Sequence, residues 1–172
     1  MNAPRYQAYY CEENAWHLCA DPRLAGAEIE VAIVTNAART VALWHQRAAT
    51  QPGAPVVWDY HVLLFAKGDA GWSTWDLDTT LGMPVPAQRW LDATFVEVLP
   101  RLTPRFLLLS ASDYAQRFAS DRRHMRDEHG QWLQPPPPWP PIGNGHTLPG
   151  LLALDRGTWL TLDELRARYR EP

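Results

Sequence analysis

The sequence predicts a single domain, residues 1–172, that combines helices with strands. Its length and its 46% share of hydrophobic residues suffice for one substantial core. Segments in which apolar residues recur with helical spacing lie on both sides of a middle part that is rich in β-branched and aromatic residues. No internal repeat interrupts this order. We therefore expect one domain with mixed secondary structure.

The N-terminal part of the chain predicts an extended arm, one helix and two strands. A helix follows the first ten residues, because Ala15, Trp16 and Leu18 have helical spacing and acidic residues occupy its first turn. Pro22 indicates that the last turn of this helix is irregular. The next two segments are short, apolar and rich in β-branched residues, which is typical of strands. The expected helix and strands span residues 12–24, 28–36 and 40–45.

The middle of the chain predicts a β-hairpin with a glycine-containing turn. Its two strands are residues 56–66 and 72–79. If the turn is centred just after Gly68, His61 lies directly opposite Asp76 on the same face of the hairpin. A slip of two residues would replace Asp76 by Asp78 as the partner of the histidine. We favour the register that pairs His61 with Asp76.

The C-terminal half predicts further helices, a strand and a stiff proline-rich segment. The proline run contains Trp139, which favours a strap packed against its own domain over a ligand for an aromatic groove in another protein. The last helix opens with a Thr-Leu-Asp-Glu capping box at Thr161. The expected segments, in chain order, are residues 88–99, 106–110, 111–122, 133–141 and 161–170.

Composition and charge argue against several classes of partner. A net charge of −3, with one lysine against fifteen arginines, offers no basic stripe for a nucleic acid. No segment approaches the ~20 apolar residues of a membrane span, and the N-terminus lacks the basic-then-apolar pattern of a signal peptide. We therefore expect a cytoplasmic protein. Cys11 and Cys19 lie roughly 12 Å apart on the expected helix, so both thiols should be free.

A cysteine, a histidine and an aspartate occur in the order of a nucleophilic acyl-transfer site. Cys11 stands at the start of the first helix, where unpaired N–H groups lower the pKa of a thiol and can hold an oxyanion. Glu12 and Glu13 oppose a thiolate, so the cysteine needs a histidine partner. His61 fits that role, with Asp76 as the carboxylate that orients its ring.

Each of these residues also has a plain structural interpretation. Buried cysteines are usually inert, as we expect of Cys19, and a lone histidine in an apolar strand is usually a core residue. Asp76 and Asp78 also fit a solvated strand edge or a hard-cation site, but two carboxylates without further oxygen ligands are weak evidence for a metal. His124 and His129 are five residues apart, which misses the spacing of a zinc-binding helix. We expect neither a metal nor a cofactor.

Five blocks of the sequence are specific when they are taken together. They are Tyr10-Cys11-Glu12-Glu13-Asn14, Trp58-Asp59-Tyr60-His61-Val62, Asp76-Leu77-Asp78-Thr79, Phe118-Ala119-Ser120-Asp121-Arg122-Arg123-His124-Met125 and Pro135-Pro136-Pro137-Pro138. In this order they resemble the protein N-terminal glutamine amidohydrolase family. The resemblance implies an α+β domain of the papain/transglutaminase-like (cysteine-protease-like) fold, with a central antiparallel sheet packed between helices. It also implies a monomer.

The resemblance implies a reaction and assigns roles to three residues. The reaction is hydrolysis of the side-chain amide of an N-terminal glutamine, which yields N-terminal glutamate and ammonia. The family's catalytic cysteine falls on Cys11, its histidine on His61 and its aspartate on Asp76. The expected partner is therefore the N-terminal glutamine of a peptide or protein, and the expected chemistry passes through a thioester.

Selection of a chain terminus requires a group that pairs with an α-ammonium. Glu12, Glu13, Asp59 and Asp121 are candidates, and the sequence does not choose among them. The competing hypothesis is a thiol enzyme of the same fold with another acyl substrate, such as a protease, a transglutaminase or a protein-internal glutamine deamidase. A binding module without activity is a more distant alternative, because the cysteine, histidine and aspartate are all present.

Overall fold

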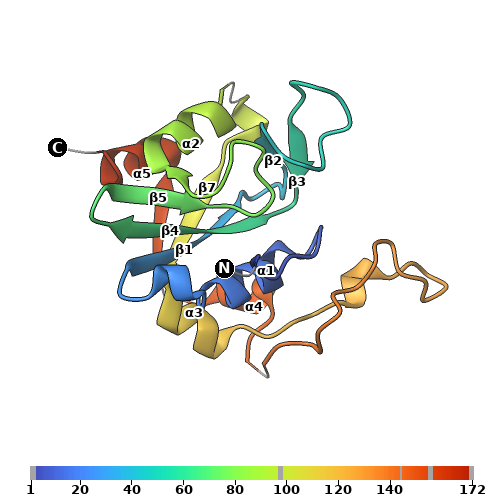
Figure 1. The fold of residues 1–172 in the computed structure, drawn as a ribbon. Coiled ribbons are helices and arrows are strands. Elements are labelled where there is room, and N and C mark those ends of the chain that lie inside the picture. Colours follow the sequence, from blue (N-terminus) through green and yellow to red (C-terminus); the bar gives the residue numbers. More distant parts are fainter. Residues whose placement is uncertain (1–2, 97–98, 144, 155–156, 171–172) are drawn as a thin grey trace.

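The computed structural model describes residues 3–96, 99–143, 145–154 and 157–170, and its centre is a six-stranded sheet (Figure 1). The strand order is β6-β5-β4-β1-β7-β8, and every neighbouring pair is antiparallel. The strands are β1 (Glu28–Thr35), β4 (His61–Gly68), β5 (Gly71–Trp75), β6 (Val85–Pro86), β7 (Arg105–Ser110) and β8 (Thr158–Thr161). A separate antiparallel pair consists of β2 (Val41–Leu43) and β3 (Val56–Trp58).

Helices cover both faces of the six-stranded sheet (Figure 1). One face packs against α1 (Cys11–Leu18), α3 (Ala111–Arg117) and α4 (Leu148–Ala153). The other face packs against α2 (Ala87–Thr94) and α5 (Leu162–Arg168). Three short 3-10 helices are η1 (Pro22–Leu24), η2 (Pro100–Leu102) and η3 (Arg123–Met125). The predicted α+β class, with a central antiparallel sheet between helices, is therefore confirmed.

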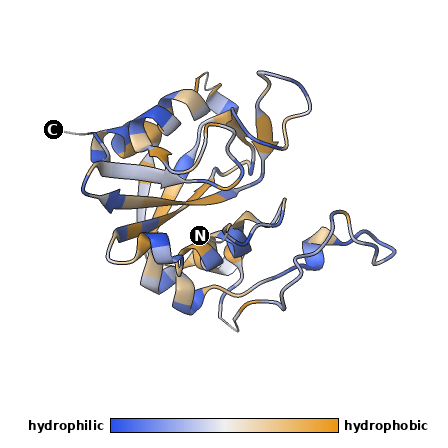
Figure 2. Ribbon diagram, in the orientation of Figure 1, coloured by the Kyte–Doolittle hydropathy of each residue, from blue (hydrophilic) through white to orange (hydrophobic). Residues whose placement is uncertain are grey.

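The two inner strands β1 and β4 are apolar along most of their length because both of their faces are buried. Ile33 and Leu64 contribute to the core beneath α1, whereas the next residues, Val34 and Phe65, contribute to the core beneath α2. Successive side chains of a strand point to opposite faces, so a strand with two covered faces needs a continuous hydrophobic run. Figure 2 shows hydrophobic residues gathered along these inner strands and hydrophilic residues over the outer helices and loops.

The predicted strand over residues 56–66 is wrong, because the chain breaks it into β3 and β4. At the break, the side chain of Asp59 accepts a hydrogen bond from the N–H of Tyr60 at 2.9 Å, and its backbone carbonyl accepts the hydroxyl of Thr35 at 2.8 Å. With these bonds, Asp59 and Tyr60 lie outside the strand ladder. As a result β3 pairs with β2, and β4 begins at His61 in the central sheet.

The predicted register of the β4–β5 hairpin is also wrong, by two residues. Gly68 pairs with Gly71 across a tight turn. Continued along the strands, this register would bring His61 opposite Asp78 instead of Asp76. Strand β5 ends before both aspartates, so neither of them is part of the ladder. Their positions depend on the loop that follows β5.

Other predicted segments form, some of them shorter than expected. The first helix ends at Leu18, before the 3-10 turn at Pro22, and the predicted helix over 88–99 forms α2, which ends at Thr94. Residues 97–98 of that prediction lie outside the described residues. The capping box at Thr161 is present. The short α4 and β8 were not predicted.

Two remaining expectations are matched. Trp139 packs against the core beneath α1, as expected of a proline-rich strap held on its own domain. Cys11 and Cys19 are both free thiols. Within the described part of the chain, no helix combines the length and hydrophobicity needed to cross a bilayer.

Candidate active site

Cys11 is presented at the first residue of α1, on the floor of a small pocket. Tyr9, just before it, has a φ of 69°, a left-handed conformation that non-glycine residues adopt at an energetic cost. The buried Tyr10 then forms the N-cap, and its carbonyl accepts the N–H groups of Glu13 and Asn14. The pocket has a volume of about 230 Å³ and is lined by Tyr9, Cys11, Trp58, Asp59, Tyr60, His61, Asp78, His124 and Met125.

His61 is the first residue of β4, and it lines the same pocket as Cys11. Its Nε2 lies 2.9 Å from Oδ1 of Asp76, and the ring of Trp58 stacks on it with centroids 6.0 Å apart. Burial lowers the pKa of His61, but the charge and hydrogen bond of Asp76 outweigh burial and raise it. Because Nε2 is occupied, Nδ1 is the ring nitrogen left for proton exchange with the thiol.

Asp76 is held by four hydrogen-bond donors. Its Oδ1 accepts the ring of His61 and the backbone N–H of Asp78, and its Oδ2 accepts Gln46 Nε2 at 3.2 Å and Trp90 Nε1 at 3.3 Å. Burial raises the pKa of this carboxyl, but His61 and the other donors lower it further, below its ordinary value. Asp76 is therefore an ionised carboxylate of fixed orientation, and it contacts His61 as the sequence predicts although the predicted register is wrong.

The surroundings of the Cys11 thiol oppose its ionisation. Burial raises its pKa well above the ordinary value, and the nearby charges of Glu12 and Asp78 raise it further. The thiol lies 3.6 Å from Oε2 of Glu12, whose own pKa is raised to about 7 by burial. This result corrects the expectation that the helix start lowers the pKa of Cys11. The short α1 offsets neither burial nor the two carboxylates.

Comparisons with known proteins identify the family of this chain. The family model described as N-terminal glutamine amidase matches residues 6–158. The chain belongs to the N-terminal glutamine amidase family. A human protein named protein N-terminal glutamine amidohydrolase is 33% identical over 95% of this chain and 87% of its own length. Proteins of the same name from Bos taurus and Arabidopsis thaliana are each 36% identical, over 81% and 83% of this chain and 71% of their own lengths.

Three of the four acidic residues proposed to bind an α-ammonium are already paired with arginines. Glu13 is buried and accepts two hydrogen bonds of 2.7 Å from Arg122, and Trp139 Nε1 donates a third. Asp121 forms an ion pair with Arg123 at 2.7 Å. Glu13 therefore joins α1 to the strap, Asp121 is occupied by its near neighbour Arg123, and neither residue lines the pocket of this amidase.

The other two acidic candidates lie closer to the thiol. Asp59 lines the pocket, but its side chain is half exposed and forms an ion pair with Arg39 at 3.1 Å. Glu12 contacts Cys11 from within the core and does not line the pocket. Asp78, for which the sequence suggests a substitute for Asp76, a solvated strand edge or a cation ligand, is buried and lines the pocket. The carboxylate of Asp78 is the feature that sequence reasoning undervalued.

A metal site is a weak interpretation of the same residues. Ligand atoms of His61, Asp76 and Asp78 lie within 4.8 Å of one another. However, both oxygens of Asp76 accept N–H donors, and Nε2 of His61 is one of its partners. A cation in this place would have to displace these hydrogen bonds. His124 lines the pocket while His129 is exposed beside Glu128, so these two histidines do not form a site together.

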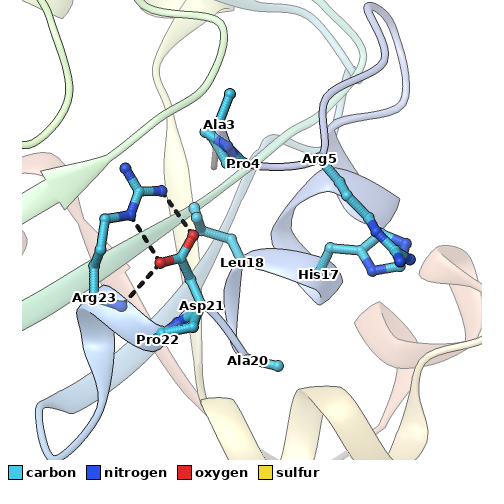
Figure 3. Close-up of a pocket in the computed structure, with 9 residues that line it drawn as sticks. All are labelled: Ala3, Pro4, Arg5, His17, Leu18, Ala20, Asp21, Pro22 and Arg23. Carbon is cyan, nitrogen blue, oxygen red and sulfur yellow. Dashed lines mark hydrogen bonds and ion pairs between the residues drawn. The ribbon is translucent and has the colours of Figure 1, made fainter. Parts of the chain in front are cut away.

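A larger hollow of about 680 Å³ lies away from the thiol. It is formed between the N-terminal arm and the C-terminal end of α1, and Figure 3 shows its lining residues, among them Arg5, His17 and the ion-paired Asp21 and Arg23. The Arg5 and His17 side chains lie together on one side of it (Figure 3). Its described lining residues include no thiol, and its carboxylate, Asp21, is paired with Arg23, so its size does not make it the centre of the chemistry.

Proposed function

We propose that this amidase hydrolyses the side-chain amide of an N-terminal glutamine in peptides and proteins, releasing ammonia and leaving N-terminal glutamate. The observation that carries the proposal is the pocket that Cys11 and His61 share, with His61 held by the buried Asp76. These are the parts of a thiol acyl-transfer site: a thiol, a histidine in the same pocket and a carboxylate bonded to that histidine. The names of the relatives supply the substrate class.

The proposed first step is attack of the Cys11 sulfur on the carbonyl carbon of the glutamine side chain. Nδ1 of His61 accepts the thiol proton as the C–S bond forms, because the high pKa of the thiol disfavours a free thiolate. The tetrahedral intermediate then collapses, His61 returns the proton to the departing nitrogen, and ammonia leaves. The product of this half-reaction is a thioester between Cys11 and the glutamate side chain.

The second half-reaction uses the same groups in the reverse order. His61 removes a proton from water, the hydroxide attacks the thioester, and the C–S bond breaks to restore the thiol and release the new carboxylate. Both oxyanions need hydrogen-bond donors. The backbone N–H at the start of α1 is one available donor. The side chain of Trp58 lines the pocket, and its buried Nε1, which has no hydrogen-bond partner among the described residues, is another candidate.

We extend the proposal to the organisation of the protein. Residues 1–172 act as one catalytic domain of the papain/transglutaminase-like fold, as a monomer in the cytoplasm. The support for one domain is that both cores pack against the same central sheet. Sedimentation of the purified chain tests the monomer, and a trace of stable dimer at micromolar concentration would contradict it.

A panel of peptides tests the proposed reaction against its main alternative, a protein-internal glutamine deamidase. Ammonia release is measured for one peptide that begins with glutamine, its acetylated form, an asparagine-initiated form and a form with internal glutamine. Only the first should react well. Asparagine is shorter by one methylene, which leaves its carbonyl roughly 1.3 Å short of the sulfur, and ~1 Å of misplacement can cost about 10² in rate. Comparable turnover of internal glutamine would favour the alternative.

A further inference from the structure

Asp78 is a buried carboxylate that lines the pocket and forms no ion pair with a described lysine or arginine. It is 5% exposed and lies in the same pocket lining as Cys11 and His61. Its Oδ1 accepts the hydroxyl of Tyr6 at 2.7 Å, and among the described residues no lysine or arginine forms an ion pair with it. A buried carboxylate without a counter-charge carries a large desolvation cost, which an incoming cation would offset.

The other acidic residues near the pocket are less suited to a cationic ligand. Asp59 is the only other carboxylate among the described residues of the lining, and it is half exposed and already paired with Arg39. Asp76 is saturated by four N–H donors and orients His61. Of the three carboxylates, Asp78 alone combines burial and access to the pocket with the absence of an ion pair to a described lysine or arginine.

We propose that Asp78 binds the α-ammonium group of the N-terminal residue of the substrate. The proposal rests on the function proposed above, and it adds the group that would distinguish a chain terminus from an internal or acetylated glutamine. An ammonium donates up to three hydrogen bonds and brings a positive charge to the carboxylate, whereas an acetylated nitrogen keeps a single N–H and has no charge. Without the ammonium, the carboxylate would stay buried and unpaired. A blocked terminus therefore loses the charge-assisted hydrogen bond and also leaves the desolvation cost of Asp78 without compensation.

Tyr6 is the positioning residue for this contact. The N-terminal arm is fixed to α1 by a pair of hydrogen bonds between the Asn14 side chain and the backbone of Gln7, of 2.9 and 2.8 Å. This places the Tyr6 hydroxyl on one oxygen of Asp78, and the Arg47 guanidinium lies over the Tyr6 ring at 5.6 Å. No hydrogen bond from the described residues reaches the second oxygen of Asp78, which leaves that oxygen for the ligand.

The same contact would couple recognition to the chemistry. The charge of Asp78 is one of the two carboxylate charges that disfavour ionisation of Cys11. An ammonium bound to Asp78 neutralises that charge while the glutamine side chain approaches the sulfur. The thiol is then easier to deprotonate when a free chain terminus is present than when the pocket is empty.

Binding to an inactive protein tests the proposal without relying on turnover. Calorimetry on the Cys11→Ala protein compares a glutamine-initiated peptide with the same peptide in which hydrogen replaces the α-amine. We expect the free amine to bind about 10- to 100-fold more tightly, as is usual for a charge-assisted contact. Adding Asp78→Asn should reduce this preference to less than about threefold, whereas adding Asp59→Asn should preserve it.

Kinetics of the active protein provide the second readout. In Asp78→Asn, KM for the glutamine-initiated peptide should rise more than kcat falls, and Tyr6→Phe should shift KM in the same direction by a smaller factor. Equal weakening of both peptides by Asp78→Asn, or loss of the amine preference in Asp59→Asn instead, would overturn the proposal. Absence of ammonia release by the wild-type protein would contradict the proposed reaction, while the calorimetric comparison would still decide the role of Asp78.

Discussion

The two sides of the pocket differ in how far their charges and hydrogen bonds are satisfied. On the side of β4 and the loop after β5, His61 is bonded to Asp76, and Asp76 has a donor for each of its lone-pair directions. On the side of α1, the thiol of Cys11 has a carboxyl at 3.6 Å and burial that disfavours its ionised form. The hydrogen bonds of His61 and Asp76 are therefore formed before substrate binds, whereas the surroundings of the Cys11 thiol do not yet favour its ionised form.

This difference suggests a division of labour within the site. A saturated Asp76 keeps the histidine ring in one orientation without reorganisation during the reaction. On the side of α1, the negative charges of Glu12 and Asp78 disfavour a thiolate at Cys11. A positive group bound near Asp78, or protonation of Glu12, would reduce this negative charge around the sulfur.

Replacement of Cys11 by serine should abolish ammonia release and leave the fold intact. A serine hydroxyl is a far weaker nucleophile than a thiol, and its pKa leaves less of it ionised. Cys19→Ser is the matched control, because Cys19 lies at the other end of α1 and packs against the same core. It should retain most of the activity. The reverse result in the ammonia assay, with circular dichroism showing two folded proteins, would refute the assignment of Cys11.

Asp76→Asn should reduce kcat by a large factor, up to about 10⁴ by analogy with the orienting aspartate of serine enzymes. The asparagine removes the charge that stabilises protonated His61 and presents an N–H₂ group to donors. Asp78→Asn should reduce kcat much less, because Asp78 does not contact the ring through a hydrogen bond. The measurement is kcat for both variants under saturating substrate. An equal or larger loss of kcat in Asp78→Asn would show that the wrong carboxylate has been assigned to His61.

The contact between His61 and Asp76 shows which features of the site the sequence predicts and which it does not. Short apolar segments rich in β-branched residues predict most of the strands, and the motif order points to Cys11, His61 and Asp76. The register of the hairpin depends on whether its turn is centred after Gly68 or after Asp69, and the glycines at positions 68 and 71 allow either choice. Asp76 reaches His61 because of the loop after β5. In this loop the backbone N–H of Asp78 donates to the side chain of Asp76, a contact that no sequence periodicity predicts.

The electrostatics of the α1 side were predictable only in part. The sequence shows that Glu12 and Glu13 follow Cys11, but only the structure separates them. Glu13 is neutralised by Arg122, which lies 109 residues away in the chain, whereas Glu12 remains beside the sulfur. Likewise, the contact of Tyr6 with Asp78 joins residues 72 positions apart. Such long-range pairing determines which carboxylate is free, and local patterns do not encode it.

Gln46→Ala should reduce kcat roughly tenfold, a smaller effect than the loss of Asp76. The Gln46 side chain is buried and donates to Oδ2 of Asp76, so its removal takes away one of four donors and leaves space beside the carboxylate. KM should change little, because Gln46 does not line the pocket. Steady-state kinetics check this separation. A rise in KM without a fall in kcat would mean that Gln46 contacts substrate instead of supporting Asp76.

Glu12→Gln should produce the smallest change in rate and a distinct change in pH dependence. Burial raises the pKa of Glu12 in the folded protein to about 7, above the 4.5 of an ordinary glutamate. A raised carboxyl pKa contributes stability that is complete below the unfolded value and is lost as the pH rises through the folded value. The wild-type protein should therefore lose up to about 3 kcal/mol between pH 4.5 and pH 7 from this group, and Glu12→Gln should not.

Denaturant unfolding at pH 5 and pH 8 measures this difference. The stability of Glu12→Gln relative to the wild-type protein should increase from pH 5 to pH 8, while the exposed control Glu128→Gln should show no such trend. Because the substitution also removes a negative charge 3.6 Å from the sulfur, alkylation of Cys11 should reach half of its maximal rate at a lower pH. Parallel stability curves and an unchanged alkylation profile would show that Glu12 is not the carboxylate that opposes the thiolate. Asp78 would then be the carboxylate whose charge adds to the effect of burial on the pKa of Cys11.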